Sequence, residues 1–308
     1  MKANIDFINP KPKSNLGYIV KNSKLINILL KQIKKKRNVN FLFESSLHDL
    51  SYKNSKIISL SNKKKINAKL VIAADGKKSA VRELLGTNLF TKNYSEKALV
   101  VNFFHEKPHN NIAYEFFLKN GPLALLPMQR EKNRNQSALI WSNIPDVVDL
   151  ISSRTLQTEY IEEVLNEKIL KQLGSVLRIN SIQSFPLSAH INEKFYEDRI
   201  IYAGDAAHSI HPIAGQGWNL GLRDVKSITS LLIKVKNKEY SLGTKEFCKK
   251  YNALCYYDAY RLFEITDKLN WIFKKDQVHY KFLKKIGLSL INKNRTIKNK
   301  ISDFAMGI

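Results

Sequence analysis

The sequence predicts an α/β protein in which a parallel-sheet domain is interrupted by a mostly antiparallel β-sheet and followed by C-terminal helices. Two short apolar runs, at residues 70–74 and 199–203, each lead through a glycine-containing turn into a helical pattern. That order of elements is typical of parallel strands with covering helices. Between the two runs, residues 98–142 carry strand patterns without a long helix. The second sheet is therefore predicted to be an insertion in the first domain.

The segment ahead of the first parallel strand is predicted to be one helix and two further strands. Residues 22–36 carry leucine and isoleucine at helical spacing, with polar residues between them. Apolar runs at 39–43 and 57–60 are separated by polar turns and predict strands. After the strand at 70–74, residues 79–85 predict a short helix.

The inserted sheet and the rest of the chain follow in order. Alternation of apolar and polar residues and the Gly121-Pro122 turn favour antiparallel pairing. A helix is predicted at 155–173, another at 220–235, and amphipathic helices over 245–308. We expect three parts: a discontinuous domain of residues 1–96 and 186–262, a sheet domain of 97–185, and a helical segment of 263–308.

Composition indicates a folded protein and limits the classes of partner that we expect it to bind. The 308 residues are 44% hydrophobic, enough for a sizeable core, and no run of 18 apolar residues occurs. The polar, lysine-dotted start does not resemble a signal peptide, so we expect a cytoplasmic location. The net charge of +24 comes from lysines spread along the chain. We therefore expect no dedicated nucleic-acid binding, and leave open a peripheral association with the inner face of the membrane.

Cysteine and histidine positions argue against a metal site. Cys248 and Cys255 lie seven residues apart on a predicted helix, too far for a disulfide, and are expected to be buried thiols. His208 and His211 lie three apart in a loop and lack a third ligand. His208 is expected instead to shape that loop, and no metal is predicted.

The strongest chemical signal begins where the strand at 199–203 ends. Gly204 and Asp205 follow the strand directly, at the edge where open α/β sheets bind ligands. Glycine lets a ligand approach the backbone closely, and a carboxylate there can accept hydrogen bonds from a polyol. These two residues are therefore predicted to contact a cofactor.

A glycine-rich turn follows within ten residues. Pro212 leads into Gly215, Gln216, Gly217 and Asn219, which open the helix predicted next. The free N–H groups of a helix N-terminus and its positive potential favour a ligand that carries negative charge. In a flavoprotein this arrangement would stabilise the N1 and C2 carbonyl edge of the reduced flavin.

The order GDAAH, then P-x-A-G-Q-G-x-N-x-G-x-x-D, resembles the second flavin-contacting motif of the p-hydroxybenzoate-hydroxylase-like FAD-dependent monooxygenases. A second segment resembles that family's Asp-Gly motif, which lies near the pyrophosphate and is implicated in FAD and NAD(P)H binding. It comprises Asp75 and Gly76 after the strand at 70–74, with Arg82 in the following helix. The resemblance implies that these three residues bind cofactor.

Within that superfamily the chain is most similar to the ubiquinone-biosynthesis hydroxylases. The likeness is carried by residues 16–22, 121–127, 184–188 and 305–307, so it spans nearly the whole sequence. It implies an enzyme that uses FAD, NAD(P)H and O₂ to hydroxylate a polyprenyl phenol, a lipophilic aromatic substrate. It also suggests association with a ubiquinone-biosynthesis complex. No acid or base catalyst is assigned, because in this chemistry the cofactor carries the difficult step.

One part of the family pattern is missing from this sequence. Relatives begin with a strand, a GxGxxG turn and a helix that hold the ADP part of FAD, whereas the first glycine here is Gly17 and no GxGxxG occurs. We expect the sheet to lack its central strand and to expose apolar edges. Three explanations stay open: a start codon assigned too late, a truncated or split gene, or a protein that no longer binds FAD.

Two other functions are left open by the sequence. One is the same chemistry on a small soluble aromatic compound, and the other is a non-catalytic scaffold derived from a flavin fold. Five aromatic residues of the inserted sheet could line a pocket for a prenyl tail or belong to the ordinary core. They are Phe103, Phe104, Phe116, Phe117 and Trp141.

Overall fold

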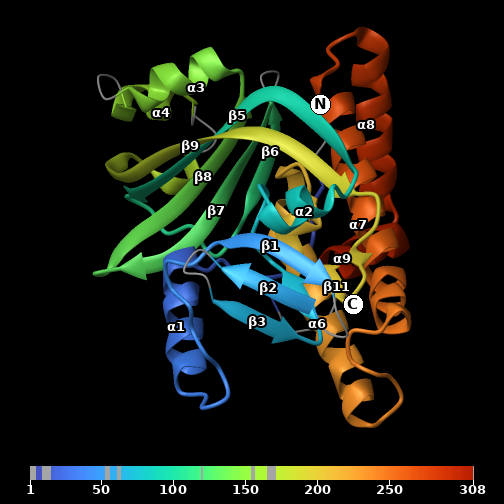
Figure 1. Ribbon diagram of the computed structural model, residues 1–308. Coiled ribbons are helices and arrows are strands. Elements are labelled where there is room, and N and C mark those ends of the chain that lie inside the picture. Colours follow the sequence, from blue (N-terminus) through green and yellow to red (C-terminus); the bar gives the residue numbers. More distant parts are fainter. Residues whose placement is uncertain are drawn as a thin grey trace.

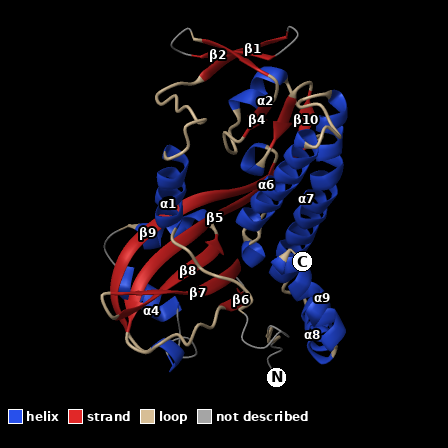
Figure 2. Ribbon diagram, turned by 90° about the horizontal axis from the view of Figure 1, so that it is seen from below, coloured by secondary structure: helices blue, strands red, loops and turns tan. Residues whose placement is uncertain are grey.

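The computed structural model describes residues 5–8, 15–52, 56–60, 64–118, 121–153, 157–164 and 171–307. Within them lie a six-stranded sheet, two three-stranded sheets and a set of long C-terminal helices, drawn in Figure 1 and turned in Figure 2. The predicted α/β class with an inserted antiparallel sheet is confirmed.

The first helix, α1 (Asn22–Lys34), forms where leucine and isoleucine spacing predicts it, yet none of its residues is buried. In Figure 1 it stands at the lower left, beside the end of the large sheet. The strand predicted at 39–43 is wrong. That segment has no strand structure, and Phe43 is 68% exposed. A buried strand requires a hydrogen-bonded neighbour, and the described residues supply none at this place.

A small antiparallel sheet precedes the first parallel strand. It consists of β1 (Leu47–Tyr52), β2 (Lys56–Leu60) and β3 (Lys65–Ala68), joined in sequence order. The strand predicted at 57–60 is therefore confirmed as β2. This sheet connects directly into β4 (Val71–Ala73).

The parallel pair that positions the site joins segments far apart in the sequence. β11 (Ile200–Tyr202) pairs parallel with β4, with Ile201 opposite Ile72, and antiparallel with β10 (Tyr196–Glu197). All three residues of β11 are completely buried, which explains their apolar character. Among the described strands β4 lies at the edge of this sheet, and Ile72 is 44% exposed.

The large sheet is antiparallel throughout. Its strand order is β12-β9-β5-β8-β7-β6, and β12 is a two-residue strand that ties the segment after Gly204 to β9. The bounds are Leu89–His105 for β5, Tyr114–Leu118 for β6, Gly121–Glu131 for β7, Arg134–Asn143 for β8, Val176–Asn192 for β9 and His208–Ser209 for β12.

One face of the large sheet packs against α3 (Pro145–Ser152) and α4 (Gln157–Val164). Sequence patterns did not predict α3, although Pro145 at its first turn is a known helix-start signal. The helix predicted at 155–173 is confirmed for α4, while 154–156 and 165–170 lie outside the described residues. The core on this side consists of apolar side chains: Leu99, Val101, Phe103, Leu123, Leu125, Leu139, Trp141, Val148, Ile151, Ile161, Leu173 and Val176.

A second core surrounds β11 and lies under the remaining helices. Residues of α6 (Gly217–Lys236) and α7 (Lys245–Lys274) pack there, together with α2 (Ala80–Leu85). The chain ends in α8 (Val278–Lys293) and α9 (Arg295–Met306), which continue the column at the right of Figure 1. Cys248 and Cys255 of α7 are free and buried, as predicted.

The three-part domain division stays a prediction. Its borders at 96/97, 185/186 and 262/263 fall inside β5, β9 and α7 respectively, so continuous elements run across all three. Pro186 lies in β9 opposite Lys97, beside an irregularity in the pairing, where a missing N–H is tolerated.

Among the described residues, none of the helices combines the length and the apolar character needed to cross a membrane.

Leu139 tests the core under α3 and α4. Its side chain is 1% exposed, and we expect Leu139→Ala to lower the free energy of unfolding by about 2–5 kcal/mol, because it leaves a cavity in close-packed surroundings. Leu150→Ala is the control, because the Leu150 side chain on α3 is 60% exposed. It should change the free energy of unfolding by about 0.5 kcal/mol or less. Urea unfolding of both variants measures the difference, and equal effects would contradict this description of the core.

Candidate functional site

Parallel pairing brings both predicted motifs to one edge of the sheet. β4 ends at Ala73 just ahead of Asp75 and Gly76, and β11 ends just ahead of Gly204 and Asp205. The Ala203 N–H donates to the Ala73 carbonyl at 2.9 Å, so the strands stay paired up to the turns. The carboxyl ends of parallel strands are the usual ligand-binding edge. The structure thus brings together motifs that are about 130 residues apart in the sequence.

The Asp-Gly turn is built by its own short helix. Asp75 accepts the Val81 N–H at 3.2 Å, and the Ser79 hydroxyl accepts the Arg82 N–H at 3.1 Å. Both contacts satisfy free donors at the start of α2. Gly76 has a φ of +84°, which side-chain-bearing residues rarely adopt. Asp75 is therefore held at the edge while part of its carboxylate caps the helix.

Arg82 fastens the two motifs to each other. Its guanidinium donates to the Ala206 carbonyl at 3.1 Å and to the Lys77 carbonyl at 2.5 Å. Arg82 was predicted to contact cofactor. In the structure its donors reach backbone oxygens on both turns, and its role in cofactor binding stays a prediction.

Asp224 of α6 contacts the start of the turn that follows β11. One of its carboxylate oxygens accepts the Gly204 N–H at 2.8 Å and also lies 2.8 Å from His208 Nε2. Asp224 is 1% exposed and His208 is 2% exposed. The expectation that His208 shapes the loop agrees with this contact. Asp224 was absent from the predicted site residues, although a carboxylate within the buried stripe Leu220, Asp224, Ile228 and Leu231 is a detectable signal.

Two polar residues at the end of β9 complete the support. His190 Nε2 lies 3.0 Å from the Asp205 carbonyl, and the Asn192 amide donates to the Ala206 carbonyl at 3.1 Å. Burial, and then the neighbouring Arg82 charge, lower the pKa of His190 to about 4. The imidazole is therefore neutral at neutral pH, and its Nε2–H can donate a hydrogen bond to the Asp205 carbonyl. Sequence patterns did not single out either residue, because both lie on a strand 12 or more residues earlier.

The glycine-rich turn leads directly into α6. Pro212 precedes the single turn η2 (Ile213–Gly215), Gly215 has a φ of +60°, and α6 begins at Gly217. Within the part of the chain that the structure describes, no side chain caps α6, so the first N–H groups of the helix keep their capacity to bind a ligand. Asn219 donates to the Gln216 side chain at 3.4 Å, which orders the turn.

The residues at this edge fit the flavin end of FAD. A Cβ atom built at Gly76, Gly204, Gly215 or Gly217 would meet nothing within 4 Å, so the glycine backbone borders open space. Asp205 is exposed there, at the edge that the helix N-terminus also borders. The donor set is therefore backbone N–H groups and one carboxylate. For the adenosine end, the 308 residues contain no GxGxxG fingerprint.

Lys77 adds a cation to the same edge. Its ammonium donates to the Ser188 carbonyl at 2.8 Å. Burial lowers the pKa of Lys77, and the nearby Asp205 carboxylate partly opposes that effect. A lysine between the two turns favours a ligand that carries phosphate.

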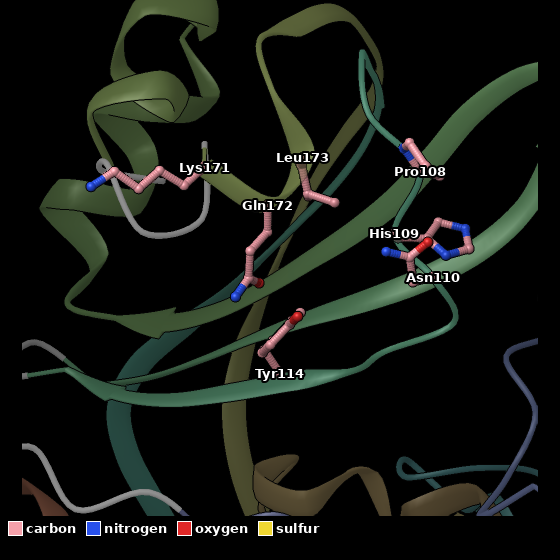
Figure 3. A pocket seen from close by; sticks show the side chains of 7 residues that line it. All are labelled: Pro108, His109, Asn110, Tyr114, Lys171, Gln172 and Leu173. Carbon is pink, nitrogen blue, oxygen red and sulfur yellow. The ribbon is translucent and has the colours of Figure 1, made fainter.

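A separate polar cavity of about 290 Å³ lies at the other end of the large sheet. Figure 3 shows Lys171, Gln172 and Leu173 on one side of it, Pro108, His109 and Asn110 on the other, and Tyr114 below Gln172. β5 and β9 pair from Leu89 opposite Asn192 near the site to His105 opposite Val176 near this cavity. The length of these strands separates the cavity from the glycine turns.

The five aromatic residues of the inserted sheet divide between core and surface. Phe103 and Trp141 are buried in the core under α3 and α4, and Phe116 packs against that core. Phe104 is 4% exposed and lies under the Arg134 guanidinium. Phe117 is 40% exposed and stacks on Phe273 of α7 with ring centres 3.6 Å apart. Phe117 alone of the five is exposed.

Among the described residues, no three His, Cys, Asp or Glu side chains are placed to hold a metal ion.

The strand-end carboxylate, the open glycine turns and the uncapped helix N-terminus define an α/β protein that binds a nucleotide cofactor. Residues 17–252 match the family described as FAD binding domain. The chain belongs to this FAD-binding family, as its motifs predicted.

Similar proteins with described activities extend this assignment. The chain is 29% identical to a ubiquinone hydroxylase of Rhodospirillum rubrum over 98% of its own length and 70% of that protein. It is 25% identical to the 3-demethoxyubiquinol 3-hydroxylase of Escherichia coli, over 95% of this chain and 73% of that protein.

Solved structures show the same fold. The p-nitrophenol 4-monooxygenase of Pseudomonas putida superposes with a TM-score of 0.69 at 18% identity, covering 92% of this chain and 71% of that one. A probable FAD-dependent monooxygenase of Pseudomonas aeruginosa gives 0.67 at 19% identity, covering 82% and 70%.

Asp224 tests the support of the turn. Asp224→Ala leaves the Gly204 N–H and His208 without their buried acceptor, and we expect it to lower the free energy of unfolding by about 2–5 kcal/mol. Asp224→Asn keeps one acceptor oxygen and should cost less. Asp49→Ala, at an exposed position of β1, is the matched control and should be near neutral. Thermal and urea unfolding measure all three, and an Asp224→Ala protein as stable as the control would contradict the assigned role.

Proposed function

We propose that this protein is an FAD-dependent monooxygenase that hydroxylates the aromatic ring of a polyprenyl phenol in ubiquinone biosynthesis, using NAD(P)H and O₂. The observation that carries the proposal is the open turn between Pro212 and Asn219, at the carboxyl end of β11, with the Asp205 carboxylate beside it. Bound FAD, once reduced by NAD(P)H, would supply the activation of O₂.

The chain's own residues would bind and orient the flavin. Backbone N–H groups at the start of α6 would stabilise negative charge on the flavin, and Asp205 would accept hydrogen bonds from the ribityl chain. Asp75, Gly76 and Arg82, which the neighbouring turn and α2 hold beside this edge, would lie at the pyrophosphate side. Asp224, His190 and Asn192 hold these groups in place before the ligand arrives. A preorganised site of this kind loses little free energy to reorganisation.

The similar ubiquinone hydroxylases of Rhodospirillum rubrum and Escherichia coli support a lipophilic aromatic substrate. The exposed Phe117, stacked on Phe273, offers an apolar surface for such a compound between the large sheet and α7. A substrate of this kind resides in membranes, and the net charge of +24 favours anionic membrane surfaces. We therefore place the protein at the cytoplasmic face of the membrane, in association with other enzymes of the pathway.

Gly217→Ala separates ligand binding from folding. Apart from its chain neighbours and its own helix backbone, the added methyl group meets no atom of the described residues within 4 Å, and the φ of Gly217 is not positive, so stability should be unchanged or slightly higher. In the complex the methyl group would occupy the space of the isoalloxazine, and the dissociation constant should rise about tenfold. Titration with FAD, and with lumiflavin as a probe of the ring site alone, measures it by flavin absorbance and fluorescence.

Gly287→Ala is the matched control for that measurement. It places a methyl group in open space on α8, and we expect it to leave flavin affinity unchanged. Unaltered affinity in Gly217→Ala, or no binding of either flavin to the unsubstituted protein at millimolar concentration, would overturn the proposed function. The second outcome would favour a scaffold role.

Asp205→Ala tests the carboxylate. Loss of one charged acceptor should weaken FAD binding about 10- to 100-fold while leaving lumiflavin binding nearly unchanged, because lumiflavin has no ribityl chain. Asp198→Ala, at the exposed turn that precedes the other end of β11, is the control and should bind both flavins normally. Full retention of FAD affinity in Asp205→Ala would show that the carboxylate does not contact the polyol.

A further inference from the structure

His211 is buried beside the turn of residues 212–219, to which the proposed function assigns the flavin and which is named the flavin-facing turn below. Its side chain is 0% exposed, and its Nδ1 accepts the N–H of Ile213 at 3.2 Å. Ile213 begins the single turn η2 that ends at Gly215. Since Nδ1 accepts a hydrogen bond, the proton of the neutral ring resides on Nε2. His211 therefore holds the first amide of the turn only in one protonation state.

The surroundings of His211 come from β5 on one side. The Tyr94 ring lies edge-on to the imidazole with centres 4.7 Å apart, and Glu96 Oε2 lies 3.7 Å from Nε2. Tyr94 and Glu96 flank Ser95, whose φ of +52° lies at an irregularity of the β5–β9 pairing, and both side chains reach the imidazole from this bulge. Glu96 is 7% exposed and forms an ion pair with Lys274 of α7.

The other side of the cluster comes from α7. Asp267 pairs with Lys92 of β5 at 2.5 Å, and Asn270 is buried beside it on the same helix. Asp267, Asn270 and Lys274 repeat at helical spacing, so all three lie on the helix face toward β5. We name these seven residues the β5–α7 cluster: Lys92, Tyr94, Glu96, His211, Asp267, Asn270 and Lys274. Each carboxylate in it already has a lysine partner.

The cluster leaves His211 neutral at neutral pH. Burial lowers the pKa of His211 to about 4, and the Asp267 charge only partly opposes that effect. Burial, with Asp267, raises the pKa of Tyr94, so its hydroxyl stays protonated. The lysine partners limit how far Glu96 and Asp267 can attract a proton to the ring. The flavin-facing turn is therefore hydrogen-bonded to a neutral imidazole that lies among buried, paired charges.

We propose that His211 is a positioning residue of the flavin-facing turn, whose neutral imidazole fastens the Ile213 amide and so orders Ile213–Gly215 against β5 and α7. For its effect on flavin affinity this inference rests on the proposed function, whereas the effect on the turn itself does not. A protonated ring carries hydrogen on both nitrogens and has no acceptor for Ile213. The histidine then no longer holds the turn.

The direction of the pH dependence follows from the lowered pKa. An opened turn would restore the ordinary histidine pKa near 6.5, so the open form binds the proton more tightly. The ordered turn is therefore fully stabilised above about pH 6.5 and loses stability as the pH falls toward 4. His190, whose pKa is also lowered to about 4, titrates in the same window near Asp205. Variants at position 211 separate the two contributions.

Amide hydrogen exchange of peptides covering residues 209–217 tests the proposal without any cofactor. His211→Leu removes the acceptor, and we expect exchange in these peptides to quicken roughly tenfold at pH 7.5. His211→Asn places an oxygen where Nδ1 lies but cannot gain a proton. It should exchange like the unsubstituted protein at pH 7.5. In the unsubstituted protein, exchange corrected for intrinsic rates should quicken between pH 7.5 and pH 5, because His211 gains a proton. The corrected rate of His211→Asn should rise less over the same range.

Controls separate a local effect from unfolding. His279→Leu, at an exposed position of α8, should leave residues 209–217 unchanged. Peptides from β8 report on global stability in every variant. Exchange in His211→Leu equal to that of the unsubstituted protein would overturn the proposal, as would a His211→Asn protein that exchanges as fast as His211→Leu.

Lumiflavin titrations of the same proteins at pH 7.5 give a second readout. We expect weaker binding in His211→Leu and restored binding in His211→Asn. Failure of the unsubstituted protein to bind flavin would count against the proposed function alone, because the exchange result does not depend on it. Equal flavin affinity in all three proteins, with altered exchange, would overturn the link between this histidine and the cofactor.

Discussion

A single buried carboxylate, Asp224, is the constraint on which the site depends. It accepts the Gly204 N–H and contacts His208 with one oxygen, and both groups lie in the segment that connects β11 to the glycine-rich turn. A buried charge is stable only when hydrogen-bonded donors compensate for its lost hydration. The position of the turn and the burial of Asp224 therefore require each other. Because Asp224 belongs to α6, the same contact sets where the N-terminus of that helix points.

Side chains outside the parallel strands hold the turn that follows β11 in place and join it to the Asp-Gly turn. Arg82, Asn192 and His190 reach the carbonyls of Ala206 and Asp205 from α2 and β9. These carbonyls cannot pair within a regular strand, so side chains satisfy them. The consequence is an edge whose carbonyls are hydrogen-bonded from behind and whose glycine backbone borders open space. A cofactor that binds there meets groups that are already ordered.

Some of the architecture followed from local patterns and some did not. The buried strand β11, the glycine turn and α6 lie where apolar runs and glycines predict them, because residue type and local spacing mark all three in the sequence. The strand expected at 39–43 was wrong, since a strand depends on a neighbour that local sequence does not specify. Helix α3 was missed, as its short apolar stripe, Val148 and Ile151, becomes meaningful only against the large sheet.

The amino-acid sequence by itself determined the class of the protein and the glycine and aspartate positions of its motifs. Those features depend on residue type and spacing, which are visible in one dimension. Tertiary structure alone decided that β4 and β11 are parallel neighbours, that Asp224 and His190 support the turn, and that His211 lies against Tyr94 and Glu96. The physical reason is distance along the chain. Hydrogen bonds and burial act between atoms a few ångströms apart, whereas these partners are separated by up to about 130 residues.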